Sequence, residues 1–132
     1  ISLEEGVELV WHAFDDMKGG EIYVKKIPSM KVTDVALAVD KNTKQEEVGI
    51  RPGEKLHEQM IGIEDALYTY EYPAHFKILP SINDWAKDKD RIGDGIRVSE
   101  TFMYTSDNNA EWMEISELQE WIEKNRNKIG NI

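Results

Sequence analysis

Residues 68–79 read Tyr-Thr-Tyr-Glu-Tyr-Pro-Ala-His-Phe-Lys-Ile-Leu, the part of this chain richest in aromatic and β-branched side chains. Such a composition is typical of β-strands. Pro73 interrupts the run and has no amide hydrogen to donate within a sheet. The stretch therefore predicts an edge strand, a bulge or two short strands, bounded by Pro80.

Before this stretch, the sequence predicts a helix over residues 3–17. Ser2 and Glu5 have the spacing of a capping box, and apolar residues then recur at intervals of three and four. Gly19-Gly20 is a helix stop, and the alternation that follows predicts a strand over residues 21–26.

The rest of the chain predicts short elements separated by turns. Up to residue 61 we expect a short helix capped by Thr33 and ending at Val39, a strand at 47–50, a turn at 51–53 and a helix over 54–61. Later in the chain we expect a loop or insertion at 81–98 and a strand at 102–106. A Ser116–Gln119 capping box predicts a final helix, whose buried face holds Leu118, Trp121 and Ile122. This mixture predicts a small α+β fold, with residues 1–132 as a single domain.

Composition excludes several classes of function. The chain has 132 residues, no cysteine, 26 acidic and 16 basic residues, and a net charge of −10. Without cysteine there is no disulfide framework, thiol catalysis or thiolate metal site. The acidic excess argues against nucleic acid and anionic membranes as partners, and no apolar run is long enough to cross a bilayer. We expect a cytoplasmic protein, with any anionic ligand sought first near Lys25, Lys26 and Lys31.

Known catalytic signatures fail on inspection. Gly93-Asp94-Gly95 begins like a dinucleotide fingerprint, but the third glycine and a preceding strand are missing. His57-Glu58 begins like a zinc-protease helix, but Ile61 stands where the second histidine ligand belongs. The residues alone therefore predict neither a catalytic centre nor a metal site.

One turn combines groups that could hold a nucleoside diphosphate. Arg51 can offer a planar guanidinium to two phosphate oxygens, and Pro52-Gly53 keeps the backbone low enough for a ligand to approach. Glu54, expected to open the next helix, can accept both hydroxyls of a ribose. The alternative is a surface turn with an Arg–Glu ion pair worth under about 1 kcal/mol, and spacing alone favours it.

Two blocks of sequence resemble a known family. They are Lys26-Ile-Pro-Ser-Met30 and Arg51-Pro-Gly-Glu-Lys-Leu-His-Glu58, supported by Phe102-Met-Tyr-Thr-Ser-Asp-Asn-Asn109. In this order they resemble the C-terminal part of the UDP-N-acetylglucosamine 4,6-dehydratases, extended short-chain dehydrogenases/reductases of polysaccharide and nonulosonate biosynthesis. The resemblance covers nearly the whole chain and is least certain at residues 81–98.

The resemblance implies a role for five residues in binding a UDP-sugar. It assigns the pyrophosphate to Arg51 and the uridine ribose to Glu54, the roles that their chemistry also suggests. It assigns Tyr23, Val24 and Lys25 to the strand that lines the uracil end of the site.

The same resemblance implies that most of the enzyme is missing. The family binds NADP on a glycine-rich Rossmann domain and uses a Tyr-x-x-x-Lys pair, yet no tyrosine here has a lysine four residues later. We therefore expect a fragment: a UDP-sugar-binding segment without cofactor of its own, inactive alone, with the Rossmann domain as its partner. The parent enzyme would be a lyase that oxidises C4, eliminates water across C5–C6 and returns the hydride to C6.

A different class of function stays open. The chain would also suit a stand-alone interaction or oligomerisation module that keeps the fold without the ligand site. Apolar surface that once faced a partner favours self-association, so we expect a homo-oligomer. The four tryptophans, Trp11, Trp85, Trp112 and Trp121, would serve either a core or such a contact.

Overall fold

In the computed structural model, which describes residues 1–82 and 84–129 apart from the Ile129 side chain, the chain forms two compact units. The first comprises residues 1–27 and 59–105, and the second comprises residues 28–58 and 106–132, of which the last three lie outside the described residues. Both helices and strands occur, so the expected α+β composition is confirmed.

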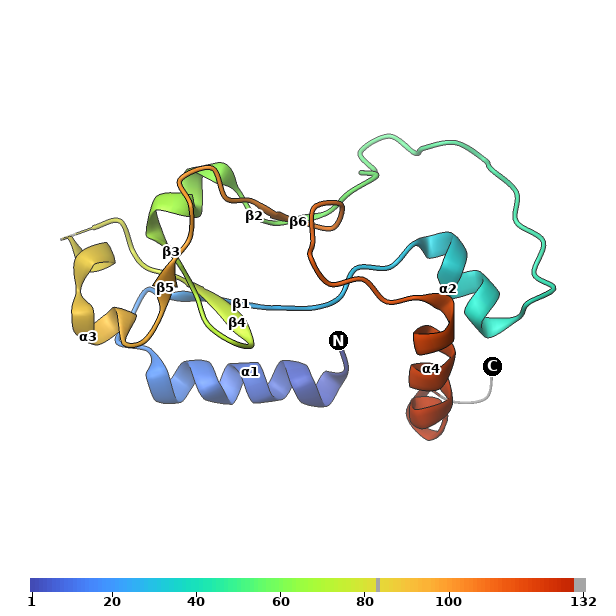
Figure 1. Cartoon of the computed structure of the whole chain (residues 1–132), viewed down its shortest axis with the longest axis horizontal. Coiled ribbons are helices and arrows are strands. Elements are labelled where there is room, and N and C mark those ends of the chain that lie inside the picture. The colour runs from blue at the N-terminus through green and yellow to red at the C-terminus, as the bar shows by residue number, and fades with distance from the viewer. Residues whose placement is uncertain (83, 130–132) are drawn as a thin grey trace. The chain divides into compact units, whose positions relative to one another are not determined.

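The first unit is built on a four-stranded antiparallel sheet in the order β1-β4-β3-β5, visible in Figure 1. The strands are β1 (Ile22–Lys25), β4 (His75–Ile78), β3 (Thr69–Glu71) and β5 (Ile96–Arg97). A two-stranded ribbon, β2 (Gln59–Ile61) with β6 (Tyr104–Thr105), belongs to the same unit. A 3₁₀ helix, η1 (Ile63–Tyr68), leads into β3.

Residues 68–79 form the centre of this sheet, because β3 and β4 lie between β1 and β5. Pro73 falls between β3 and β4, so two short strands form, one of the three outcomes that the proline predicts. Because successive side chains of a strand point to opposite faces, β4 places His75 and Lys77 on one face and Phe76 and Ile78 on the other. Phe76 and Ile78 pack with Val24, Ile61 and Tyr104 on one face.

The opposite face of the sheet carries tyrosines, Lys77 and helix α1 (Leu3–Asp16). Tyr70 and Tyr72 pack with Leu79, while Lys77 lies opposite Tyr23 in the strand register. The predicted capping box of α1 is confirmed, since Ser2 accepts a hydrogen bond from the Glu5 amide at 3.2 Å and Glu5 accepts one from the Ser2 amide at 2.7 Å.

The second unit contains α2 (Val32–Val39) and α4 (Ile115–Ile129), which pack together. Ala38 and Leu118 are its buried apolar residues among those described. Two contacts join the two stretches of chain that make up this unit. Ser29 forms a bridge with Trp112, and the amide of Glu58 donates to the Ser106 hydroxyl at 3.0 Å.

Several local predictions are wrong, each for a physical reason. Residues 47–50 form no strand, because Gly49 has φ of +80° and no described segment pairs with them. No helix covers 54–61: the Glu58 carbonyl accepts from the Ser106 amide at 2.8 Å, and β2 begins at Gln59. Helix α2 begins at Val32, before Thr33, because the Asp34 and Val35 amides donate to the Lys31 carbonyl.

The expected loop at 81–98 is more structured than predicted. It contains a 3₁₀ turn, η2 (Trp85–Lys87), helix α3 (Lys89–Ile92) and β5, while Asn83 lies outside the described residues. The final helix begins at Ile115, with the Glu114 amide donating to the Glu117 carboxylate, so Ser116 is not its cap. Leu118 is buried as predicted, whereas Trp121 is exposed. Within the described residues, no helix has the length and apolar character that a membrane span requires.

Candidate functional site

The turn predicted at residues 51–53 forms, and two hydrogen bonds between Arg51 and Glu54 close it. The Glu54 amide donates to the Arg51 carbonyl at 3.0 Å, and the Glu54 carboxylate accepts from the Arg51 amide at 2.8 Å. Gly53 has φ of +83°, a conformation that glycine adopts without the steric cost of a side chain. The turn therefore holds the Glu54 carboxylate against the backbone of Arg51, and both residues are exposed on the second unit.

The expected alternative, an ion pair between these two side chains, does not form. Glu54 uses one carboxylate oxygen on the Arg51 backbone, and the Arg51 guanidinium makes no ion pair with any residue that the structure describes. A carboxylate offers about four lone-pair positions, so Glu54 retains acceptor capacity. The arrangement leaves both charged groups available to a ligand.

The corner differs from the prediction in one respect. Glu54 was expected at the start of a helix, but residues 54–58 continue without regular structure into β2. Leu56 is strongly exposed, so no apolar face exists to hold a helix against the second unit. Glu54 is thus positioned by its own bond to the Arg51 amide.

The three residues assigned to the uracil end lie on β1 of the first unit. Val24 is buried in the core, whereas Tyr23 and Lys25 are half-buried and extend from the other face of the strand. Lys25 forms no ion pair with the described residues. Their assignment to a uracil contact stays a prediction.

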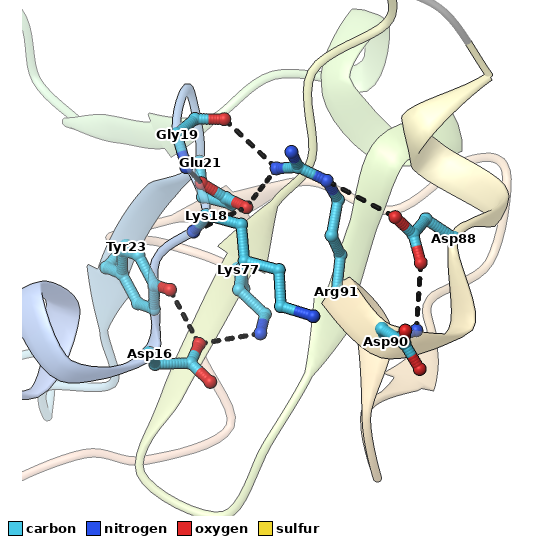
Figure 2. Close-up of polar contacts among 9 residues, drawn as sticks. All are labelled: Asp16, Lys18, Gly19, Glu21, Tyr23, Lys77, Asp88, Asp90 and Arg91. Atoms are coloured by element: carbon cyan, nitrogen blue, oxygen red, sulfur yellow. Dashed lines mark hydrogen bonds and ion pairs between the residues drawn. The ribbon is translucent and has the colours of Figure 1, made fainter.

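Tyr23 belongs to a polar network that the sequence did not reveal. Its hydroxyl donates to Asp16 at 2.6 Å, and the ammonium of Lys77 donates to the same carboxylate oxygen at 2.7 Å (Figure 2). Burial opposes the charge of Lys77, but hydrogen bonds to Asp16 and Tyr72 outweigh it and raise the pKa of Lys77. Partial burial likewise opposes the charge of Asp16, yet the bonds from Lys77 and Tyr23 lower the pKa of that carboxyl.

A second network links residues 70 positions apart. Figure 2 shows the Arg91 guanidinium beside Glu21, with which it forms a hydrogen-bonded ion pair, and beside Gly19, whose carbonyl accepts at 3.0 Å. Glu21 also accepts from the Lys18 and Gly19 amides at 3.2 and 2.7 Å. These contacts hold the loop between α1 and β1 and so fix where Tyr23 emerges.

An aromatic cluster surrounds His75 at the edge of β4. The His75 ring stacks on Tyr72 at 4.7 Å, and His12 lies edge-on at 4.7 Å. Burial, followed by the charges of His12 and Lys77, lowers the pKa of His75. The buried Nε2 atom of His75 has no hydrogen-bond partner within the described residues, so protonation there would place an unpaired charge in the cluster.

Two features that the sequence raised, a cluster of metal ligands and the Gly93-Asp94-Gly95 turn, are described by the structure as follows. Across residues 1–82 and 84–129, no three His, Cys, Asp or Glu side chains come together as metal ligands. A Cβ on Gly95 would lie 2.5 Å from the Tyr72 ring, so this glycine of the Gly93-Asp94-Gly95 turn serves packing.

Comparison with known proteins finds a family model and relatives that match this chain. The family model described as polysaccharide biosynthesis protein matches residues 1–80. A UDP-N-acetylglucosamine 4,6-dehydratase (inverting) from Campylobacter jejuni subsp. jejuni serotype O:2 is 47% identical over 127 residues, covering 92% of this chain and 38% of the relative. Its counterpart from serotype O:23/36 is 44% identical with the same coverage.

A solved structure is similar over almost the whole chain. The X-ray structure of Pen from Bacillus thuringiensis matches with a TM-score of 0.78 and 25% identity, over 96% of this chain and 38% of that one. The chain thus spans less than two fifths of the length of the dehydratases and of the solved structure that it matches.

Proposed function

Since the chain belongs to the polysaccharide biosynthesis protein family and to its UDP-N-acetylglucosamine 4,6-dehydratases, we propose that it is the UDP-sugar-binding segment of such an enzyme. It binds the nucleotide and does not catalyse the reaction alone. NADP and the groups that handle the hydride are supplied by a Rossmann-type cofactor-binding domain, with which this segment completes the substrate site.

The observation that carries this proposal is the state of the turn at residues 51–54. Arg51 is exposed and its guanidinium makes no ion pair with the described residues, while the exposed Glu54 carboxylate, bonded to the Arg51 amide, retains lone pairs. Arginine binds phosphate oxygens in a two-pronged manner, and a carboxylate accepts hydrogen bonds from vicinal hydroxyls. Arg51 therefore binds the pyrophosphate and Glu54 the ribose of a UDP-sugar.

A nuclear magnetic resonance titration of the isolated chain tests the binding role. With UDP in the low millimolar range, amide signals of residues 49–55 should shift, whereas N-acetylglucosamine alone should leave them in place. A hydrogen bond to a charged group is worth about 1.5–3 kcal/mol, so Arg51→Ala should weaken UDP binding at least about tenfold.

Arg126→Ala provides the matched control. Arg126 is an exposed arginine of the same unit whose ion pair among the described residues is with Glu123 at 2.8 Å, and its loss should leave UDP affinity unchanged. Equal effects of the two substitutions would mean that UDP responds to overall charge, and the assignment of Arg51 would be wrong.

A further inference from the structure

One long segment of the second unit contains no helix or strand. It runs from Asp40, where α2 ends, to Glu58, just before β2, and Figure 1 shows it as the trace between these two elements. Connections of more than about 12–15 residues without regular structure are uncommon, and those that occur are either functional or linkers. This one carries Arg51 and Glu54, so we call residues 40–58 the nucleotide loop.

The middle of the nucleotide loop is held by few contacts. Within residues 46–57, all of which are exposed, the hydrogen bonds that the structure shows join Arg51 and Glu54 to each other. The three apolar side chains of this stretch, apart from proline, are more than half exposed, so burial does not hold it either. The two bonds fix the shape of the turn, whereas its position depends on where the loop is attached.

The downstream attachment lies closer to the turn than the upstream one. The Glu58 amide donates to the Ser106 hydroxyl at 3.0 Å, and the Ser106 amide donates to the Glu58 carbonyl at 2.8 Å. Upstream, the Gln45 side chain donates to a carbonyl of α2 at 3.0 Å. From Glu54 to Glu58 the chain can reach at most about 14 Å, and from Gln45 to Arg51 about 22 Å. The bond to Ser106 therefore restricts the turn more tightly.

Ser106 itself belongs to a firmly held stretch of chain. It opens the turn that leads to Asn109, whose side-chain amide donates to the Ser29 hydroxyl at 3.1 Å. Ser29 is buried, and its amide and carbonyl bond to Glu111 and Met113 at 2.8 and 2.9 Å. The Asn109 side chain also accepts from the Glu111 amide at 3.1 Å, a pattern that stabilises turns. Ser106 thus offers the nucleotide loop a fixed point.

The bonds of this region connect the sequence blocks that carry the family resemblance. Ser29, Glu58 and Ser106 each come from a different one of the three blocks. The second block contains the two residues assigned to UDP, and the third contributes the hydroxyl that holds its end. A resemblance spread over three blocks is therefore matched by one connected set of hydrogen bonds within the second unit.

We propose that Ser106 is a positioning residue for nucleotide binding: its hydroxyl holds the end of the nucleotide loop and so keeps Arg51 and Glu54 in place for the pyrophosphate and the ribose. Ser106 acts through Glu58 and does not touch the ligand. A loop that must be ordered during binding lowers the affinity, whereas a loop that is already ordered avoids this cost. The inference rests on the proposed function and adds to it the residue that orders the binding loop beforehand.

Substitutions of Ser106 test the proposal in a titration of the chain with UDP, followed by amide signals. Ser106→Ala should weaken UDP binding about threefold to tenfold, the loss expected for one neutral hydrogen bond. Ser106→Thr keeps the hydroxyl and should bind UDP as the unmodified chain does. Ser116→Ala is the matched control, because Ser116 is an exposed serine of α4 in the same unit, and it should leave the affinity unchanged.

Amide hydrogen exchange without UDP supplies a second measurement. Ser106 is half-buried and its amide bond to Glu58 remains, so Ser106→Ala should fold. The Glu58 amide should exchange about threefold to tenfold faster in this variant, because its acceptor is lost. An unchanged exchange rate would show that the hydroxyl does not hold the loop, and would overturn the proposal.

The titration separates this inference from the proposed function. If Arg51→Ala weakens UDP binding but Ser106→Ala does not, Ser106 is no positioning residue and the proposed function stands. A loss of affinity that Ser106→Thr fails to restore would also overturn the proposal, because the hydroxyl would not be its cause. An unmodified chain that does not bind UDP would overturn both.

Discussion

Replacing Arg91 with methionine should destabilise the first unit by about 3 kcal/mol. Arg91 and Glu21 form an ion pair whose side chains are 8% and 2% exposed. Methionine fills much of the same space without the charge, so the substitution leaves the Glu21 carboxylate buried without its cationic partner.

The size of the effect follows from the contacts that remain. Removing one partner of a buried ion pair costs about 3–5 kcal/mol. Glu21 keeps its bonds from the Lys18 and Gly19 amides, which favours the lower end of that range. The guanidinium also lies 4.0 Å above the Trp85 ring, but a methionine side chain replaces part of that contact.

Urea unfolding, followed through resolved signals of the first unit, measures the change. Lys87→Met is the matched control: Lys87 pairs with Asp84 at 3.2 Å, yet both side chains are more than 80% exposed, so its loss should cost under about 1 kcal/mol. In an Arg91→Met background, Glu21→Gln should restore stability, because it removes the unpaired charge. The reasoning fails if Arg91→Met costs no more than Lys87→Met, or if the two changes at positions 91 and 21 are additive.

Two further outcomes concern the same unit. The pKa of His75 is lowered in the folded state, so the unfolded state binds the proton more readily. The contribution of His75 to stability should therefore be constant above about pH 6.5 and should decrease as pH falls through the folded pKa. Urea midpoints at pH 7 and pH 5 should therefore differ less in His75→Phe than in the unmodified chain, and exposed His57→Phe should show no such change. Gly6→Ala should stabilise α1 by about 0.5–1 kcal/mol, because alanine favours a helix more than glycine and the added methyl group meets no other atom. Gly95→Ala should cost about 1–3 kcal/mol, because its methyl group would collide with the Tyr72 ring. Thermal midpoints that move in the same direction for both glycines would contradict this account.

Elements with strong local signals were predictable from sequence. The capping box of Ser2 and Glu5 and the helical spacing after it specify α1, and Pro73 specifies the break between β3 and β4. The Pro52-Gly53 turn was also predictable, because few conformations accommodate that pair.

What failed depended on contacts between distant residues. Hydrogen bonds between Glu58 and Ser106 form in place of the helix expected after Glu54. No pattern in the sequence near Glu54 predicts this pairing with a residue far along the chain. Arg91 lay in a stretch that resembled a solvated loop, yet its partner Glu21 is 70 residues away. Periodicity correctly identified the apolar side of α1, but it could not show that Leu3, Trp11 and Phe14 are largely exposed, since exposure depends on what covers the helix.

The most direct test of the central claim uses a hybrid enzyme, in which this chain replaces the matched segment of the serotype O:2 dehydratase, and measures its Michaelis constant for UDP-N-acetylglucosamine. If this chain binds the nucleotide of the substrate, the hybrid dehydrates UDP-N-acetylglucosamine. Arg51→Ala in the hybrid then raises the Michaelis constant by about 10–100-fold, while Arg126→Ala leaves it unchanged. An active hybrid whose Michaelis constant is the same with and without the Arg51 guanidinium would contradict the account.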